Sequence, residues 1–257
     1  MGAAQYPVIL TYHSISEGNS PLRISPALFA EQMEWLRENV RVAPLHEIVA
    51  ALAERRALPE RTVVLTFDDG FRDFYSAAAP VLRRLRLPAI VFLPTGYCGR
   101  TNGWPGQPFS VAKEPLLDWQ QAVELVHQGF RFGAHSISHA VLTDLPADLA
   151  EHEITASKAQ IEERTGQPVE FFAYPNGRWN LAVRNLVQKH YRGACSTAAA
   201  VVESSADLFA LPRADSHYVR QPAWFRALFT SRFLAYLATR RLVRRIRRKP
   251  EGFYAKV

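Results

Sequence analysis

Two adjacent carboxylates, Asp68 and Asp69, directly follow a short apolar segment that is typical of a buried strand, residues 61–67. Aspartate before glycine is common in turns, so the pair alone can be a turn signal. Adjacent carboxylates also repel each other, and a nearby cation would relieve that repulsion. The chemistry of the pair therefore depends on what else the chain brings to the end of this strand.

Two histidines are candidate partners for such a cation. His135 and His139 lie at the end of a second strand-like segment, residues 130–136, and a helical turn at that spacing would place both imidazoles on one face. Two imidazoles and one carboxylate leave coordination positions open for water and substrate, as in catalytic metal sites. A histidine pair at this spacing also occurs on ordinary helix faces, so the pattern is weak by itself.

A third segment, residues 174–177 (Tyr-Pro-Asn-Gly), follows another strand-like run. Its composition is first of all that of a turn. In parallel βα proteins, however, sites form where strands give way to the loops that follow them. Because all three segments occupy such positions, their combination indicates a site more strongly than any one of them.

Strand-like and helix-like segments alternate along most of the chain. We predict strands at residues 7–15, 61–67, 88–95, 130–136, 169–175, 193–197 and 207–216, and helices at 25–39, 45–57, 71–86, 117–129, 148–166 and 180–191, with a break or kink at Pro80. This alternation predicts an α/β fold with a parallel sheet that is closed or partly closed into a barrel.

The charge of the chain is unevenly distributed. The 257 residues carry a formal net charge of +7, but residues 226–249 hold nine basic side chains and no acidic one, which leaves 22 basic against 24 acidic residues elsewhere. The nearly neutral remainder disfavours a nucleic-acid-binding face. We therefore expect a main domain over residues 1–225 and a basic, amphipathic C-terminal helix within a tail over residues 226–257.

Three structures are compatible with this tail: a helix lying on an anionic membrane surface, a helix packed on the barrel, or a disordered segment. Residues 1–10 lack the features of a secretory signal, which predicts a cytoplasmic protein. Peripheral contact with the inner face of the membrane would then run through residues 226–249. Cys98 and Cys195 have neither a disulfide framework nor a zinc-ligand spacing, and we expect buried thiols.

The segments "LTFDDG", "GAHSISH" and "FFAYPNG", with "LTYHSI" near the start and "LPR" near the end, resemble polysaccharide deacetylases of the NodB-homology type, carbohydrate esterase family 4. The resemblance runs from about Pro7 to Arg213. It implies a distorted (β/α) barrel and metal-dependent removal of N-acetyl groups from N-acetylhexosamine units of a polysaccharide, glycan precursor or glycolipid. The alternative is a non-catalytic carbohydrate- or lipid-binding protein on the same fold.

The resemblance also implies individual roles. Asp68 matches the catalytic base, while Asp69, His135 and His139 match the ligands of a divalent metal, usually zinc. The third segment would supply a backbone donor to the oxyanion at Asn176, and the predicted substrate-binding residues are His13, Tyr174, Pro175 and Asn176.

The chain departs from the family pattern at two positions. Many members carry an arginine before the proline of the third segment, and it is missing here; we predict that Arg213 replaces it by pairing with Asp68. The family's late Leu-x-x-His, which supplies the general acid, is not cleanly present. His217, six residues after Leu211, is the predicted catalytic substitute, and His13 at the end of the first strand is a second candidate.

Overall fold

A curled parallel sheet forms the centre of the molecule. The computed structural model describes residues 6–107 and 111–247. In that part of the chain the strand order is β7-β6-β5-β4-β3-β1-β8, with β2 beside β3, and these pairings are parallel. The strands are β1 (Val8–Tyr12), β2 (Arg41–Val42), β3 (Thr62–Phe67), β4 (Ile90–Leu93), β5 (Arg131–Ala134), β6 (Phe171–Ala173), β7 (Gly193–Cys195) and β8 (Ala214–Asp215).

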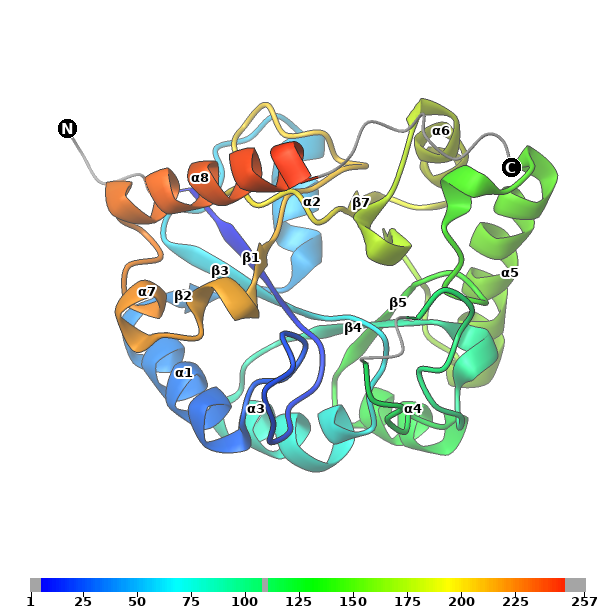
Figure 1. Ribbon diagram of the computed structural model, residues 1–257, viewed down its shortest axis with the longest axis horizontal. Helices are drawn as coiled ribbons and strands as arrows, with labels where there is room; N and C mark the ends of the chain where they lie inside the picture. Colours follow the sequence, from blue (N-terminus) through cyan, green and yellow to red (C-terminus); the bar gives the residue numbers. More distant parts are fainter. Residues whose placement is uncertain (1–5, 108–110, 248–257) are drawn as a thin grey trace.

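Helices surround the sheet, as Figure 1 shows. Neighbouring helices pack on one another, α1 against α3, α4 against α5, and α5 against α6. The helices are α1 (Pro26–Asn39), α2 (Leu45–Ala53), α3 (Ala79–Leu85), α4 (Trp119–His127), α5 (Ala147–Thr165), α6 (Leu181–His190), α7 (Pro222–Phe225) and α8 (Ser231–Arg247). The predicted α/β fold is thus confirmed, as a parallel sheet curled into a half-barrel.

Several helices begin where the sequence signals predict. The Ser25 side chain accepts a hydrogen bond from the Leu28 amide, and Pro26 occupies the first turn of α1. The helix predicted over residues 71–86 changes type along its length, from a π-helical turn at Phe74–Ala78 to α3. Pro80 lies in the first turn of α3, directly after this π-helical turn.

The chain after β7 connects the two edges of the curled sheet. Leu211 bridges to Cys195 at the β7 edge, and β8 then pairs with β1 at the other edge. The single strand predicted over residues 207–216 is therefore wrong, because the chain crosses between edges and only two residues form β8. Arg213 lies at this crossing, next to the ends of both edge strands.

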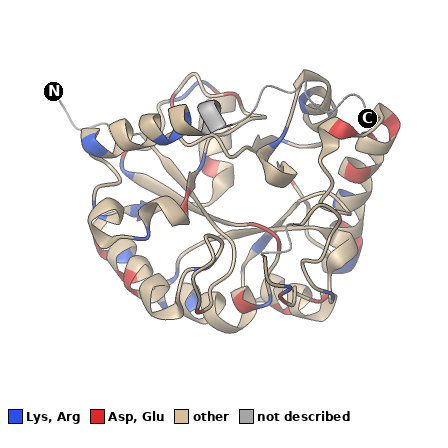
Figure 2. Ribbon diagram, viewed as in Figure 1, with Lys and Arg blue, Asp and Glu red and all other residues tan. Residues whose placement is uncertain are grey.

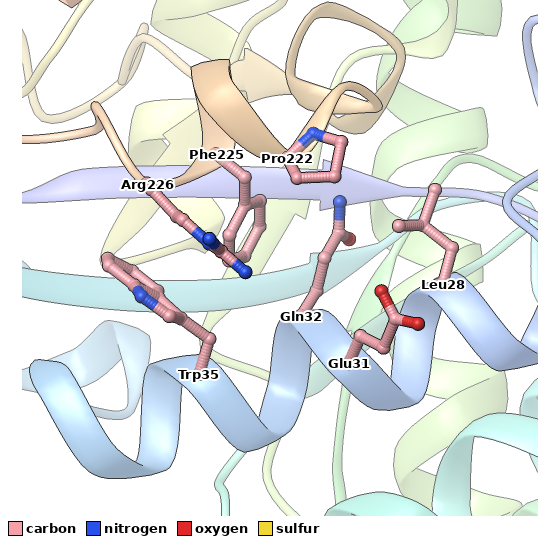
Figure 3. A pocket seen from close by; sticks show the side chains of 7 residues that line it. All are labelled: Leu28, Glu31, Gln32, Trp35, Pro222, Phe225 and Arg226. Atoms are coloured by element: carbon pink, nitrogen blue, oxygen red, sulfur yellow. The ribbon is translucent and has the colours of Figure 1, made fainter.

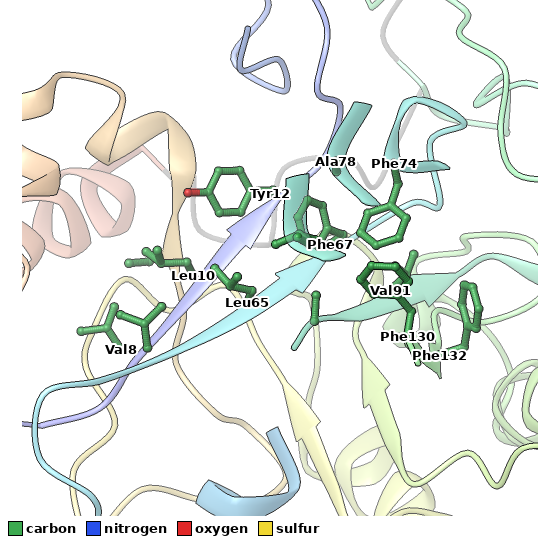
Figure 4. Packing of buried hydrophobic residues seen from close by; sticks show 14 of the residues in the cluster. Val8, Leu10, Tyr12, Leu65, Phe67, Phe74, Ala78, Val91, Phe130 and Phe132 are labelled. Carbon is green, nitrogen blue, oxygen red and sulfur yellow. The ribbon is translucent and has the colours of Figure 1, made fainter. Parts of the chain in front are cut away.

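Alternation along the strands divides the core into two clusters. In β3, Leu65 and Phe67 belong to the outer cluster beneath the helices, whereas Val64 belongs to the inner cluster inside the curl. Figure 4 shows part of the outer cluster, in which the Phe67 and Phe74 rings meet edge to face with centroids 4.7 Å apart. The inner cluster includes residues of α2, so α2 helps to fill the interior of the half-barrel.

The segment after residue 225 packs on the main domain. Figure 3 shows Phe225 and Arg226 beside Trp35 of α1, and the Trp35 and Phe225 rings meet edge to face with centroids 5.6 Å apart. The same outer cluster also buries four side chains of the following segment: Leu228, Phe229, Phe233 and Leu237. This packing favours the second of the three structures considered for residues 226–257. Residues 248–257, which include Arg248 and Lys249, lie outside the described residues.

The outer side of α8 is basic, and Figure 2 marks arginines along it. Arg232 and Arg241 are exposed, as is the apolar side chain of Leu242. The Arg232 guanidinium also lies over the Trp224 ring, 4.6 Å from its centroid, and the Arg240 guanidinium lies over the Tyr218 ring at 4.5 Å. Within residues 6–107 and 111–247, no helix combines the length and the apolar character needed to cross a bilayer.

Candidate metal centre and paired carboxylate

A tight turn after β3 points the two carboxylates in different directions. Asp69 and Gly70 both have positive φ, 68° and 64°. A Cβ on Gly70 would lie 2.5 Å from a methyl carbon of Leu93, so glycine is required there by both conformation and space. Asp68 and Asp69 are only 4% and 5% exposed. Buried carboxylates need charged or hydrogen-bonding partners, and each of these two has its own.

Asp69 faces the two histidines at the end of β5. Its Oδ1 atom lies 3.4 Å from Nε2 of His135 and 3.3 Å from Nε2 of His139. Burial opposes ionisation of Asp69, but hydrogen bonding to the two imidazoles outweighs it and holds the pKa of this carboxyl well below its usual range. The predicted grouping of these three residues is therefore present.

The histidines converge through a loop and not through the predicted helical turn. Ser136 and His139 both have positive φ, 62° and 57°, and no helix is assigned to residues 135–139. The loop is held from α5, where the Glu153 carboxylate accepts hydrogen bonds from the amides of Ile137 and Ser138 at 2.8 and 2.9 Å. It also accepts one from the Ser138 hydroxyl at 2.7 Å. Glu153 carries no motif signal, and sequence reasoning missed it.

The donor set suits a divalent cation. Ligand atoms of Asp69, His135 and His139 all lie within 4.8 Å of one another. Nδ1 of His135 donates to the Ala173 carbonyl at 2.7 Å, which leaves Nε2 unprotonated in the neutral ring and directed toward Asp69. One carboxylate and two imidazoles are a known ligand set of catalytic sites with open positions. These three residues can therefore hold a metal ion.

His139 is oriented by stacking. The Trp104 ring lies parallel to the imidazole, with centroids 4.1 Å apart and an interplanar angle of 24°. Nδ1 of His139 is buried and has no hydrogen-bond partner among the described residues, so it lacks the support that Ala173 gives His135. Trp104 is itself 5% exposed and meets the Tyr97 ring edge to face. Stacking on Trp104 thus fixes the orientation of His139, whereas a hydrogen bond to the Ala173 carbonyl fixes that of His135.

We expect Trp104→Ala to weaken affinity for a divalent metal, probed with zinc, by about tenfold, because residues that orient metal ligands commonly contribute that much. Trp104→Phe keeps a ring over the imidazole and should retain most of the affinity. Zinc titration against a competing chromophoric chelator measures both. Trp224→Ala, in α7, is the matched control and should leave affinity unchanged. Equal affinity in all three variants would contradict the orienting role of Trp104.

Asp68 forms a two-armed ion pair with Arg213. The guanidinium donates to the two carboxylate oxygens at 2.8 and 2.6 Å, and Arg213 is only 1% exposed. Nε of Arg213 donates to the Ser196 carbonyl at 2.8 Å, which fixes the direction of the side chain. Burial opposes the charge on Asp68, but the arginine charge and hydrogen bonds outweigh it and lower the pKa of the carboxyl. The predicted pairing is confirmed; the catalytic role of Arg213 stays a prediction.

The two candidate general acids lie in different surroundings. His13 follows β1, and its charge would act on both Asp68 and Asp69. His217 is exposed, and the charges acting on it are those of Asp215 and of two arginines, Arg220 and Arg240. The structure thus brings His13 to the carboxylates and does not bring His217 there, because the short β8 ends in a turn at Ser216–Val219 that carries His217 outward.

The third segment forms a turn that supports the site from β6. Tyr174 is fully buried and its hydroxyl donates to the Phe209 carbonyl at 2.8 Å, so its ring cannot contact a substrate as we predicted. Pro175 is buried, whereas Asn176 is exposed with φ of 56°. Asn176, whose backbone amide is the predicted oxyanion donor, is thus the exposed residue of this turn, and its role stays a prediction.

Comparison with known proteins agrees with this geometry. The family model described as polysaccharide deacetylase matches residues 55–192, which is more than half of the chain. YxkH of Bacillus subtilis, itself named a polysaccharide deacetylase, is 29% identical over 207 residues, which make up 80% of this chain and 69% of YxkH. The poly-beta-1,6-N-acetyl-D-glucosamine N-deacetylase of Escherichia coli K12 is 33% identical over 128 residues, 46% of this chain but only 18% of that protein.

Two solved structures share the fold over most of the chain. IcaB from Ammonifex degensii superimposes with a TM-score of 0.74 and 25% identity, covering 91% of this chain and 98% of IcaB. The Streptococcus pyogenes deacetylase PplD, in complex with acetate, gives a TM-score of 0.71 and 25% identity over 83% of this chain and 93% of PplD. With its curled parallel sheet, its Asp-His-His cluster and the family match over residues 55–192, this chain belongs to the polysaccharide deacetylase family.

Proposed function

We propose that this protein is a zinc-dependent N-deacetylase that hydrolyses the N-acetyl group of N-acetylhexosamine units in a glycan or glycolipid. The observation that carries the proposal is the buried Asp68–Arg213 pair directly beside the cluster of Asp69, His135 and His139. Imidazole and carboxylate donors suit zinc. The names of the Escherichia coli and staphylococcal relatives, poly-beta-1,6-N-acetyl-D-glucosamine N-deacetylases, support an N-acetylhexosamine substrate.

The residues of the chain divide the work of amide hydrolysis. A zinc ion held by Asp69, His135 and His139 would supply Lewis acidity toward the acetyl carbonyl oxygen. Asp68, kept ionised by Arg213, accepts the proton of the water that attacks the carbonyl carbon. The two-armed pair uses one lone pair on each Asp68 oxygen, so each oxygen retains another for the water.

Collapse of the resulting adduct breaks the carbon–nitrogen bond and releases acetate and the sugar amine. The backbone amide of Asn176 would share the charge on the oxyanion, as a preorganised donor does in other acyl-transfer sites. The leaving nitrogen needs a proton, and His13, which follows β1 and whose charge would act on both carboxylates, is the candidate donor because His135 and His139 are assigned to the metal. Acetate release from N-acetylglucosamine oligomers tests the proposal; a protein that binds such oligomers but releases no acetate would be the non-catalytic alternative.

We also propose that α8 contacts an anionic membrane surface, which would keep the enzyme at the inner face of the cytoplasmic membrane. The exposed Arg232, Arg241 and Leu242 support this contact, since basic and apolar side chains together favour anionic lipid surfaces. Deleting the helix would remove the buried Phe233 and Leu237 and damage the core. Surface substitutions therefore give the cleaner test.

The double substitution Arg241→Glu and Leu242→Ser should reduce co-sedimentation with phosphatidylglycerol vesicles while acetate release from a soluble oligomer is unchanged. Both side chains are exposed, so the fold should survive. Phosphatidylcholine vesicles should bind neither protein. Undiminished sedimentation of the double variant would reject the membrane contact, and the basic residues would then be an ordinary solvated face.

A further inference from the structure

A cavity of about 400 Å³ lies at the end of the half-barrel opposite the metal centre. Its lining includes the first residues of three strands, Ile90 of β4, Arg131 of β5 and Phe171 of β6. His135 of the metal cluster instead follows the last residue of β5. Four strand residues span about 13 Å, so the cavity and the metal centre lie at opposite ends of the same strand.

Most of the residues that line the cavity are apolar, and its position follows from the strand register. β2 pairs with β3 only at Thr62 and Val63, and β4 pairs only from Thr66 onward. The edge of β3 at Leu65 therefore has no strand beside it, and a gap opens there into the half-barrel. The apolar residues at this gap are Leu45, Ala50, Leu65, Ile90, Phe132 and Phe171. The side chains of Leu45, Ile90 and Phe171 belong to the inner cluster, whereas Leu65 and Phe132 belong to the outer one.

The rim of the cavity carries an unpaired positive charge. Glu170 and Arg192 pair with each other at 2.7 Å. Arg131 is exposed, and its side chain forms no ion pair or hydrogen bond with any described residue. An apolar interior with one free guanidinium at its rim complements a molecule that has an apolar body and one anionic end.

The cavity is separated from the metal centre by packed side chains. Every second residue of a strand faces the same side of the sheet, so Arg131, Gly133 and His135 lie along the inner face of β5 and its continuation. A Cβ at Gly133 would lie 2.4 Å from the Phe92 ring, so that ring occupies the space between the two ends. On its far side, the Arg213 guanidinium lies 5.7 Å from the Phe92 centroid. A ligand in the cavity would therefore be distinct from the substrate at the metal centre.

We propose that this cavity binds a single-chain amphipathic anion, with its alkyl chain in the apolar interior and its carboxylate or phosphate at Arg131. The volume lies in the range of natural ligand sites, about 300–1,000 Å³. Each buried methylene should raise affinity by about fourfold. The charge-assisted contact with Arg131 should contribute tenfold or more.

Isothermal titration of the whole protein with decanoate, decyl phosphate, octanoate, decanol and inorganic phosphate tests the site. We expect one binding site for a ten-carbon anion, with octanoate about 16-fold weaker than decanoate for two methylenes fewer. Decanol and inorganic phosphate should bind at least tenfold more weakly than the ten-carbon anion. Comparison of decanoate with decyl phosphate decides which headgroup the rim prefers. Affinity that is independent of chain length, or equal for decanol and decanoate, would overturn the proposal.

Variants assign the binding to this cavity. Arg131→Ala should lower the affinity for the anionic probes by tenfold or more and leave the affinity for decanol unchanged. Arg131→Lys keeps the charge and should retain most of the affinity for the anions. Ala50→Phe should fill the cavity and abolish binding of every ten-carbon probe. Arg37→Ala, an exposed arginine on α1, is the matched control. Undiminished binding in both Arg131→Ala and Ala50→Phe would place the ligand elsewhere. None of these titrations depends on deacetylase activity, which Arg131→Ala should leave intact.

Discussion

Asp68→Asn is expected to lower turnover by roughly 10²–10⁴-fold while leaving metal binding intact, the usual span for a lost general base. Asparagine keeps the shape of aspartate but offers no basic oxygen. The metal cluster uses the neighbouring carboxylate, and the positive φ of Asp69 turns the two side chains apart. Steady-state acetate release and zinc stoichiometry on the same preparation measure the two effects separately.

Asp69→Asn is the informative comparison for this prediction. It replaces a charged ligand by a neutral one, so weaker zinc binding should appear first, and excess zinc should restore part of the activity. The same excess should do nothing for Asp68→Asn. Equal metal loss in the two variants, or rescue of Asp68→Asn by zinc, would show that the two carboxylates do not divide the work as proposed.

Arg213→Ala should produce the second large effect, on both turnover and stability. Removing one partner of a buried ion pair leaves the other charge uncompensated and typically costs about 3–5 kcal/mol. Asp68 and Arg213 are 4% and 1% exposed, so solvent can do little to compensate. We expect a lower free energy of unfolding in urea and a strong loss of turnover. Arg213→Lys keeps the charge but not the two-armed geometry, so it should recover part of the stability and part of the turnover.

The pH dependence of Arg213→Ala follows from the sign of the pKa shift. In the native pair the Arg213 guanidinium overcomes the effect of burial and lowers the pKa of Asp68, so the pair stabilises the fold at neutral pH. That contribution is lost as pH falls through the lowered pKa. Without Arg213, burial raises the pKa of Asp68, and the acidic limb of the pH–rate profile should move to higher pH. An unmoved limb together with normal stability would make Arg213 an ordinary strand-end residue.

The grouping of the site could be predicted because parallel strands deliver their ends to one edge of the sheet. Asp69, His135 and His139 each follow a strand that was evident from its apolar pattern, and the structure brings them together. Arg213 was predicted from the absence of an arginine elsewhere, and the closure of the sheet by β8 carries it to Asp68. Chemical types and strand order were sufficient for the grouping of Asp69 with the histidines, whereas the pairing of Arg213 with Asp68 also depended on the resemblance to the deacetylase family.

Other parts of the site depend on contacts that no local pattern encodes. The two histidines converge through a loop with left-handed residues, and Glu153 of α5, which is distant in sequence, holds the Ile137 and Ser138 amides of that loop. Trp104 comes from a loop rich in glycine and proline, where an aromatic residue gives no sign of which ring it will cover. Tyr174 was predicted at the substrate because of its neighbours in sequence, yet its ring packs inward under the turn.

Acetate release during zinc titration of the metal-free enzyme tests the central claim most directly. With N-acetylglucosamine oligomers as substrate, activity should be absent without metal and rise to a plateau at one zinc per chain, since Asp69, His135 and His139 form one cluster. His139→Ala, which lacks one ligand, should reach no comparable plateau. Acetate release by the metal-free protein at the full rate, or an unchanged titration of His139→Ala, would contradict the account.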